Sequence, residues 1–263
     1  MQAPTEGSYV EIAPDPRLGA WVECFWVGRP GDARVPARIL PDGCTDIVLQ
    51  LEATSPGAMT AARAEAVGTM TRPLIVMPDG QKEFVGVRFR PGRARAVFGI
   101  PASELTDLSV EMGELWRDSE EVLEPLLIGS TSARIGVFQR LLLARLERAS
   151  PPPREVEGAV RALLRTGGNL SIAALGPALG VTRQHLARRF TEWVGTPPKM
   201  FARVVRARRV LALARAAHAV DWSKLALDAG YYDQSHLAAE LKELTGLPPR
   251  EWVGTRSRTR KAE

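Results

Sequence analysis

Gln184 and Arg188 lie four residues apart in a segment whose other side is apolar. A helix advances about 100° per residue, so both side chains project from one face, while Leu186, Phe190 and Trp193 project from the opposite one. Gln can form two hydrogen bonds to adenine, and Arg can form two to guanine, from the major groove of DNA. This face therefore has the chemistry needed to read base edges.

The neighbours of this pair suit contacts that position a helix on DNA. Thr182 stands where a side-chain oxygen caps a helix start, and Arg183 and Arg189 flank the pair, where guanidinium groups can meet phosphates. Ala187 shares the exposed face. An ordinary solvated helix face is the alternative interpretation.

The same pattern occurs twice, which favours a base-reading role for this helix over an ordinary solvated face. Each copy predicts two short helices joined at a glycine and ended by Gly and Pro, the arrangement that places its second helix in the major groove. The two copies are Leu175, Gly180, Leu186, Phe190, Gly195-Thr-Pro-Pro, and Leu225, Gly230, Leu237, Leu241, Gly246-Leu-Pro-Pro.

The second copy has fewer long polar side chains to read with. Asp221 and Asp233 are predicted to cap its two helices. The start and exposed face of its second helix offer Gln234, Ser235, His236 and Ala239. We therefore predict a weaker reader here, and His236 fits either a DNA contact or an ordinary core or solvent histidine.

One long helix is predicted between the two copies, beginning at Pro198. It would fix their separation. Its arginines are expected to divide between phosphates and internal ion pairs, in a ratio that the sequence leaves open: Arg203, Arg206, Arg208, Arg209 and Arg215.

The two halves of the chain differ in charge. Residues 1–150 hold 16 Lys and Arg against 20 Asp and Glu, whereas residues 151–263 hold 19 against 10. An uneven surface without meaning is the alternative, but a basic half beside an acidic one is typical of a nucleic-acid module joined to another module. Because consecutive prolines form a stiff spacer, Ser150-Pro-Pro-Pro153 predicts a boundary between domains at 1–150 and 154–263.

Residues 169–252 resemble the DNA-binding domain of AraC/XylS-type transcription regulators. The likeness rests on Ala226-Leu-Asp-Ala-Gly230-Tyr-Tyr-Asp-Gln-Ser-His-Leu237 followed by Gly246-Leu-Pro-Pro. It implies seven helices, two helix-turn-helix units, and base-reading roles for Gln184, Ala187, Arg188, Gln234, Ser235, His236 and Ala239. Ala239, Leu237 and Leu241 depart from the long polar and aromatic residues of that pattern.

The first half is predicted to be rich in β-structure and to end in helices, giving an α+β chain overall. Strands are expected near Val22–Val27, Ile47–Leu51, Leu74–Met77 and Phe84–Phe89, and helices at Pro91–Phe98, Glu111–Trp116 and Ile135–Arg148. A sheet and a small barrel both fit. Through Leu40-Pro-Asp-Gly-Cys-Thr-Asp46 and Gly86-Val-Arg-Phe-Arg-Pro-Gly92, this half resembles an uncharacterised domain of some AraC-type regulators.

Two chemical roles are considered for the first half. Trp21, Phe25 and Trp26 could line an effector pocket, with a plain core as the favoured alternative. Cys24 and Cys44 could make it a thiol-based sensor or enzyme; we expect them to be packing residues, since no Lys, Arg or His cluster near them in sequence lowers a thiol pKa. All three histidines lie in the other half, and we expect no metal site, no cofactor and no catalysis.

The sequence thus predicts a cytoplasmic, sequence-specific transcription regulator that binds double-stranded promoter DNA and responds to a signal or dimerises. No apolar run approaches the roughly 20 residues of a membrane span. A small-molecule effector is an expected partner, and the full chain would bind DNA more tightly if the amphipathic segment Ile135–Arg148 paired two chains into a homodimer. An architectural DNA protein without an effector remains the third hypothesis.

Overall fold

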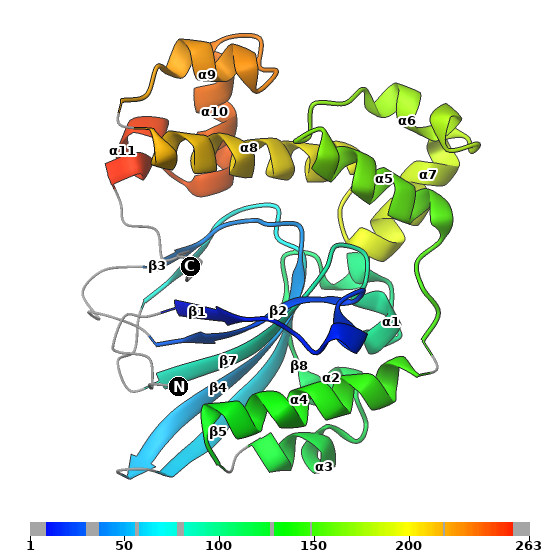
Figure 1. Ribbon diagram of the computed structural model, residues 1–263, viewed down its shortest axis with the longest axis vertical. Helices are drawn as coiled ribbons and strands as arrows, with labels where there is room; N and C mark the ends of the chain where they lie inside the picture. Colours follow the sequence, from blue (N-terminus) through cyan, green and yellow to red (C-terminus); the bar gives the residue numbers. More distant parts are fainter. Residues whose placement is uncertain are drawn as a thin grey trace.

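The computed structural model describes residues 9–29, 37–55, 58–77, 82–126, 129–147, 149–217 and 219–254. The strands gather in the first part of the chain and the helices of the last part lie across one end of them (Figure 1). The predicted α+β class is confirmed. Among the described residues, no helix is long and apolar enough to span a membrane.

Six strands form one antiparallel sheet in the order β1-β2-β7-β4-β5-β8. Val85, Val87 and Phe89 alternate along β7 toward the buried side, as the two-residue period of a strand requires. A separate ribbon pairs β3 with β6. The strands are β1 (Tyr9–Ile12), β2 (Val22–Gly28), β3 (Ala37–Ile39), β4 (Thr45–Ser55), β5 (Ala58–Val67), β6 (Leu74–Val76), β7 (Lys82–Phe89) and β8 (Ser109–Glu111).

Short helices and one long helix cover the apolar side of this sheet. Phe138 of the long helix α4 is fully buried against Phe25 of β2, with ring centroids 6.4 Å apart. The helical elements are η1 (Pro16–Leu18), α1 (Arg95–Phe98), η2 (Ala102–Leu105), α2 (Met112–Leu115), α3 (Ser119–Leu123), η3 (Glu124–Leu126) and α4 (Thr131–Leu146).

All four predicted strands are present, but the described residues form four more that the sequence analysis did not predict: β1, β3, β5 and β8. β5 was missed because its residues, Ala-Met-Thr-Ala-Ala-Arg-Ala-Glu-Ala-Val, have neither the alternation nor the β-branched content of a typical strand. Strand pairing on both edges, with β4 and β8, decides its conformation instead.

The predicted helix at Ile135–Arg148 is present as α4, although Arg148 lies outside the described residues. Its apolar face, with Ile135, Phe138 and Leu142, is buried in the core of the same chain. These side chains pack within the chain, and pairing of two chains through the remaining half-buried residues of this segment stays a prediction.

The described residues from 154 to 254 form seven helices, the number that the resemblance implied. They pack around two apolar cores, one built on Phe190 and Phe201 and the other on Leu237 and Leu241. The helices are α5 (Arg154–Arg165), α6 (Ile172–Ala178), α7 (Arg183–Val194), α8 (Pro198–Ala216), α9 (Trp222–Asp228), α10 (Gln234–Thr245) and α11 (Pro249–Gly254). The long helix α8 contributes residues to both cores and so joins the two units.

Candidate nucleic-acid interface

The first helix-turn-helix unit consists of α6, a turn at Gly180 and α7. Gly180 has φ +74°, the left-handed conformation that glycine adopts without strain. Thr182 caps α7 as predicted, since its hydroxyl accepts a hydrogen bond from the His185 backbone N–H at 3.2 Å. Gln184 and Arg188 are exposed on the side of α7 opposite its buried residues. This local structure holds both side chains on a fixed, outward-facing surface.

The flanking arginines of α7 differ from one another. Arg183 is exposed, whereas the half-buried Arg189 forms an ion pair with Glu192, 2.8 Å between nitrogen and oxygen. Ala187 is half-buried on the reading side. Arg189 must therefore leave or share its carboxylate partner to contact a phosphate.

The second unit, α9, a turn at Gly230 and α10, repeats the frame of the first. Both predicted caps are present: Asp221 accepts from the backbone N–H groups of Ser223 and Lys224, and Asp233 accepts from that of His236 at 2.7 Å. The residues proposed to meet DNA are all exposed: Gln234, Ser235, His236 and Ala239. The ring of His236 lies edge-on to the ring of Tyr231, with centroids 5.3 Å apart, and the Gln234 carbonyl oxygen accepts from the Ser223 hydroxyl.

A buried carboxylate ties α10 to α8. Glu240 is 5% exposed and accepts hydrogen bonds from Arg203, Arg206 and the Tyr231 hydroxyl, at 2.8, 2.9 and 2.7 Å. Burial raises the pKa of Glu240, but these hydrogen bonds outweigh it and hold the pKa below its ordinary value. Arg203 and Arg206 of the long helix thus pair internally, and Arg208 donates to the Asp42 carbonyl of the first region; sequence reasoning missed Glu240, the partner of the first two.

The aromatic residues proposed as an effector pocket do not line one cavity. Phe25 is in the core beside Phe138, while Trp26, the next residue along β2, stacks on Tyr9 at 5.9 Å. Trp21 lies below the guanidinium of Arg93. Because successive side chains of a strand face opposite sides of the sheet, Phe25 and Trp26 cannot converge on one ligand.

Both cysteines are buried. Burial raises the pKa of the Cys24 thiol to about 12, and it raises the pKa of the Cys44 thiol well above its ordinary value. A reactive thiol needs the opposite shift, since the thiolate is the nucleophile. The packing role expected for these residues agrees with their surroundings.

On the other face of the sheet, an ion cluster surrounds Arg88. Its guanidinium lies 3.2 Å from Asp42, 3.3 Å from Asp46 and 3.6 Å from Glu11. Desolvation raises the pKa of Asp46 to about 6 in spite of Arg88. Asp42 and Asp46 belong to the motif that carries the likeness of the first half, and pairing of β4 with β7 brings them to Arg88.

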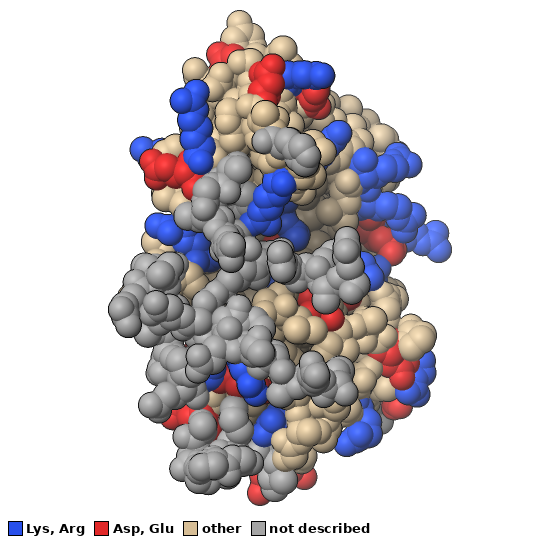
Figure 2. Space-filling model, turned by 60° about the vertical axis from the view of Figure 1, so that its left-hand side comes forward, with Lys and Arg blue, Asp and Glu red and all other residues tan. Residues whose placement is uncertain are grey.

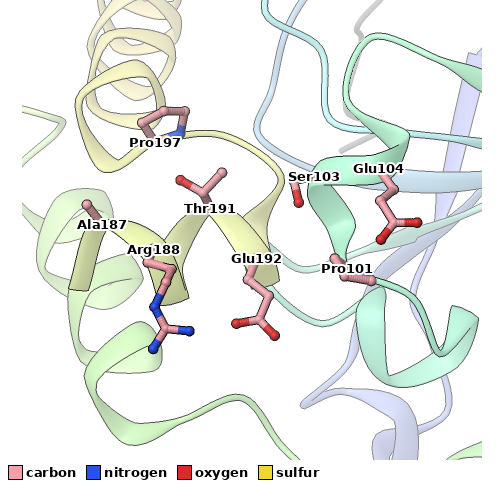
Figure 3. A pocket seen from close by; sticks show the side chains of 8 residues that line it. All are labelled: Pro101, Ser103, Glu104, Ala187, Arg188, Thr191, Glu192 and Pro197. Atoms are coloured by element: carbon pink, nitrogen blue, oxygen red, sulfur yellow. The ribbon is translucent and has the colours of Figure 1, made fainter. Parts of the chain in front are cut away.

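The outward side of α7 faces the first region across a groove. Ala187, Arg188 and Thr191 line it from α7, and Ser103 and Glu104 line it from η2 (Figure 3). On the face of the molecule drawn in Figure 2, many Lys and Arg side chains lie over the upper, helical half. Helix α7 therefore has a neighbour from the β-rich region on its outward side.

The geometry defines a double helix-turn-helix domain, and comparison with known families agrees. Residues 175–255 match a model described as a helix-turn-helix domain, and residues 10–111 match a domain of unknown function. We conclude that the chain carries a helix-turn-helix domain behind a domain of unknown function.

Several solved structures are similar to parts of the chain. An AraC-type transcriptional regulator from Chromobacterium violaceum is 22% identical, with 40% of this chain and 93% of that chain covered and a TM-score of 0.36. The C-terminal domain of AraT, a response regulator from Geobacillus stearothermophilus, is 17% identical over 43% and 95% of the two chains, with a TM-score of 0.38. ToxT from Vibrio cholerae with a bound unsaturated fatty acid is 10% identical over 96% and 97%, with a TM-score of 0.43. Among curated proteins, none matches the sequence.

Proposed function

We propose that this protein is a sequence-specific transcription regulator that inserts α7 and α10 into successive major grooves of double-stranded promoter DNA. The observation that carries the proposal is the pair of capped helices, each the second helix of its unit, held by the single helix α8. A protein that bound DNA only through a basic surface would not need two capped helices on a common support. Two units at a fixed separation favour two insertions on one face of the duplex.

The residues assigned to DNA follow from their exposure and chemistry. Gln184 and Arg188 are the base readers of α7, and Arg183 is its first phosphate contact. In α10 we assign the base contacts to Gln234, Ser235 and His236. The side chain of Ser235 is short, and those of Gln234 and His236 contact neighbours within their own unit, so this helix has less capacity to read bases. An asymmetric operator follows, with one half-site strongly constrained and the other tolerant.

Selection of bound duplexes from a random pool tests the proposal. We expect an enriched sequence whose information is concentrated in one half-site, and an affinity that falls steeply with salt as arginines displace counterions. If no sequence is enriched, the alternative of an architectural DNA protein, which binds without sequence preference, describes the protein better.

We propose further that residues 1–150 receive the signal or mediate dimerisation, and that residues 154–263 form the DNA-binding unit. The charge difference between the halves and the separate apolar cores support this division. A thiol sensor is the less favoured role, since burial disfavours the thiolate at both cysteines. Treatment with a thiol oxidant should leave the DNA affinity of the full chain unchanged.

A further inference from the structure

The end of α7 is fastened to the first region through its own backbone. The Thr69 hydroxyl donates to the Val194 carbonyl at 2.7 Å, and the Thr106 hydroxyl donates to the Gly195 carbonyl at 2.6 Å. Carbonyl groups at a helix C-terminus have no partner within the helix. Two threonines from far along the chain therefore supply the hydrogen bonds that solvent would otherwise give.

Arg95 adds a second attachment beside the groove. It forms an ion pair with Glu192 on α7, and its guanidinium lies 4.8 Å from the centre of the Trp193 ring. Both partners belong to the last turns of the reading helix. An ion pair and a cation–π contact with neighbouring residues hold α1 against α7.

DNA and η2 compete for the same side of α7. The major groove is about 12 Å wide and a helix with its side chains is about 10–12 Å across, so the groove admits α7 alone. A second element beside Arg188 would meet the phosphate backbone, and Glu104 on η2 would repel it. The Arg188 side chain itself is exposed and points away from η2, so the competition is for the space beside α7 that a bound duplex would need.

We propose that the first region, through α1 and η2, docks on the reading face of α7 and competes with DNA, so that the structure is a closed form. The inference rests on the proposed function. The apparent affinity for DNA is then the intrinsic affinity reduced by the fraction of molecules that are open. Any event that weakens the contacts of Arg95, Thr69 or Thr106 raises this fraction and tightens binding.

Two variants of the full chain test the attachment, and a third serves as the control. Arg95→Ala removes the ion pair and the contact with Trp193, and Thr106→Val removes one hydroxyl while keeping the shape of the side chain. Arg145→Ala is matched to Arg95→Ala, because Arg145 lies over Trp116 and pairs with Asp118 within the first region. Amide hydrogen exchange and affinity for the selected duplex are measured for each.

We expect faster exchange at 101–106 and 191–196 in R95A and T106V, with about three- to tenfold tighter binding of DNA. R145A should match the wild type in both measurements. A charge reversal adds a test of sign: R95E should bind more tightly, and R95E/E192R should bind more weakly than R95E, although it adds an arginine to the reading helix.

Two results would overturn the inference. One is faster exchange in R95A and T106V with unchanged affinity for DNA; the other is unchanged exchange in both variants. Failure of the proposed function looks different, because then neither the wild type nor R95A prefers any duplex. That outcome overturns both, whereas a preferred duplex bound equally by all chains overturns the closed form alone.

Discussion

The two helix-turn-helix units share a frame and differ in what surrounds their second helices. α7 carries Gln184 and Arg188 on its outward side, and its last turns are fastened to the β-rich region. α10 is exposed along its outward side but is fixed to α8 through the buried Glu240. Both units touch the first region, since Leu40 packs against the core of the second, but it is the outward-facing helix of the first unit whose C-terminus that region holds by hydrogen bonds.

The comparison also separates two ways of using arginine. In α7, Arg188 is exposed, and its position is set by a capped helix. In α8, Arg203 and Arg206 point to a carboxylate and hold helices together. A count of arginines therefore overstates the number of phosphate contacts, because pairing with Glu240 removes two.

The largest effect should come from Glu240→Ala. Removal of this carboxylate leaves Arg203 and Arg206 without their buried partner. Breaking such a network should lower the free energy of unfolding by about 2–4 kcal/mol. This loss is smaller than for a fully buried ion pair, because both arginines are partly exposed. Urea unfolding checks it. A loss confined to less than about 0.5 kcal/mol would mean that the network adds nothing to the second unit.

Arg188→Ala and Gln184→Ala should each weaken specific binding by about 1–3 kcal/mol and relax preference at one or two base pairs. Ser235→Ala in the second unit is the matched comparison and should cost less. Titrations on the selected duplex and on a scrambled one provide the measurement. Equal losses on both duplexes would assign Arg188 and Gln184 to phosphates and remove the asymmetry between the units.

Removal of the caps should affect the units equally. Thr182→Ala and Asp233→Ala each delete one acceptor for a backbone N–H at the start of a reading helix, a change worth about 1 kcal/mol of stability. Thermal unfolding of the two variants gives the comparison. A much larger loss of stability in one variant would show that the two caps contribute unequally, in spite of their similar geometry.

Acid should act on the second unit through Glu240, and only weakly near neutral pH. The pKa of Glu240 is lowered in the folded chain, so its contribution to stability is present above the pKa of an unfolded Glu and is lost as pH falls through the folded value. Glu240→Gln should remove this part of the pH dependence. Equal acid sensitivity in the wild type and this variant would contradict the assignment.

Much of the DNA-binding half could be predicted from the sequence, because its signals are local. Thr182, Asp221 and Asp233 cap the helices that follow them, and Gly180 and Gly230 adopt positive φ at the predicted turns. Each feature depends on residues within a turn of helix, where spacing alone decides geometry.

The rest depended on contacts between residues far apart in the sequence. Ala-rich β5 becomes a strand only through its neighbours, and Glu240 is recognisable as a helix anchor only once α8 crosses α10. Thr69 meets Val194 across 125 residues. The sequence by itself determined which residues share the outward face of α7, since a helical face is set by spacing. Tertiary packing decided that the β-rich region lies against that helix, since no local pattern encodes which distant surfaces bury each other.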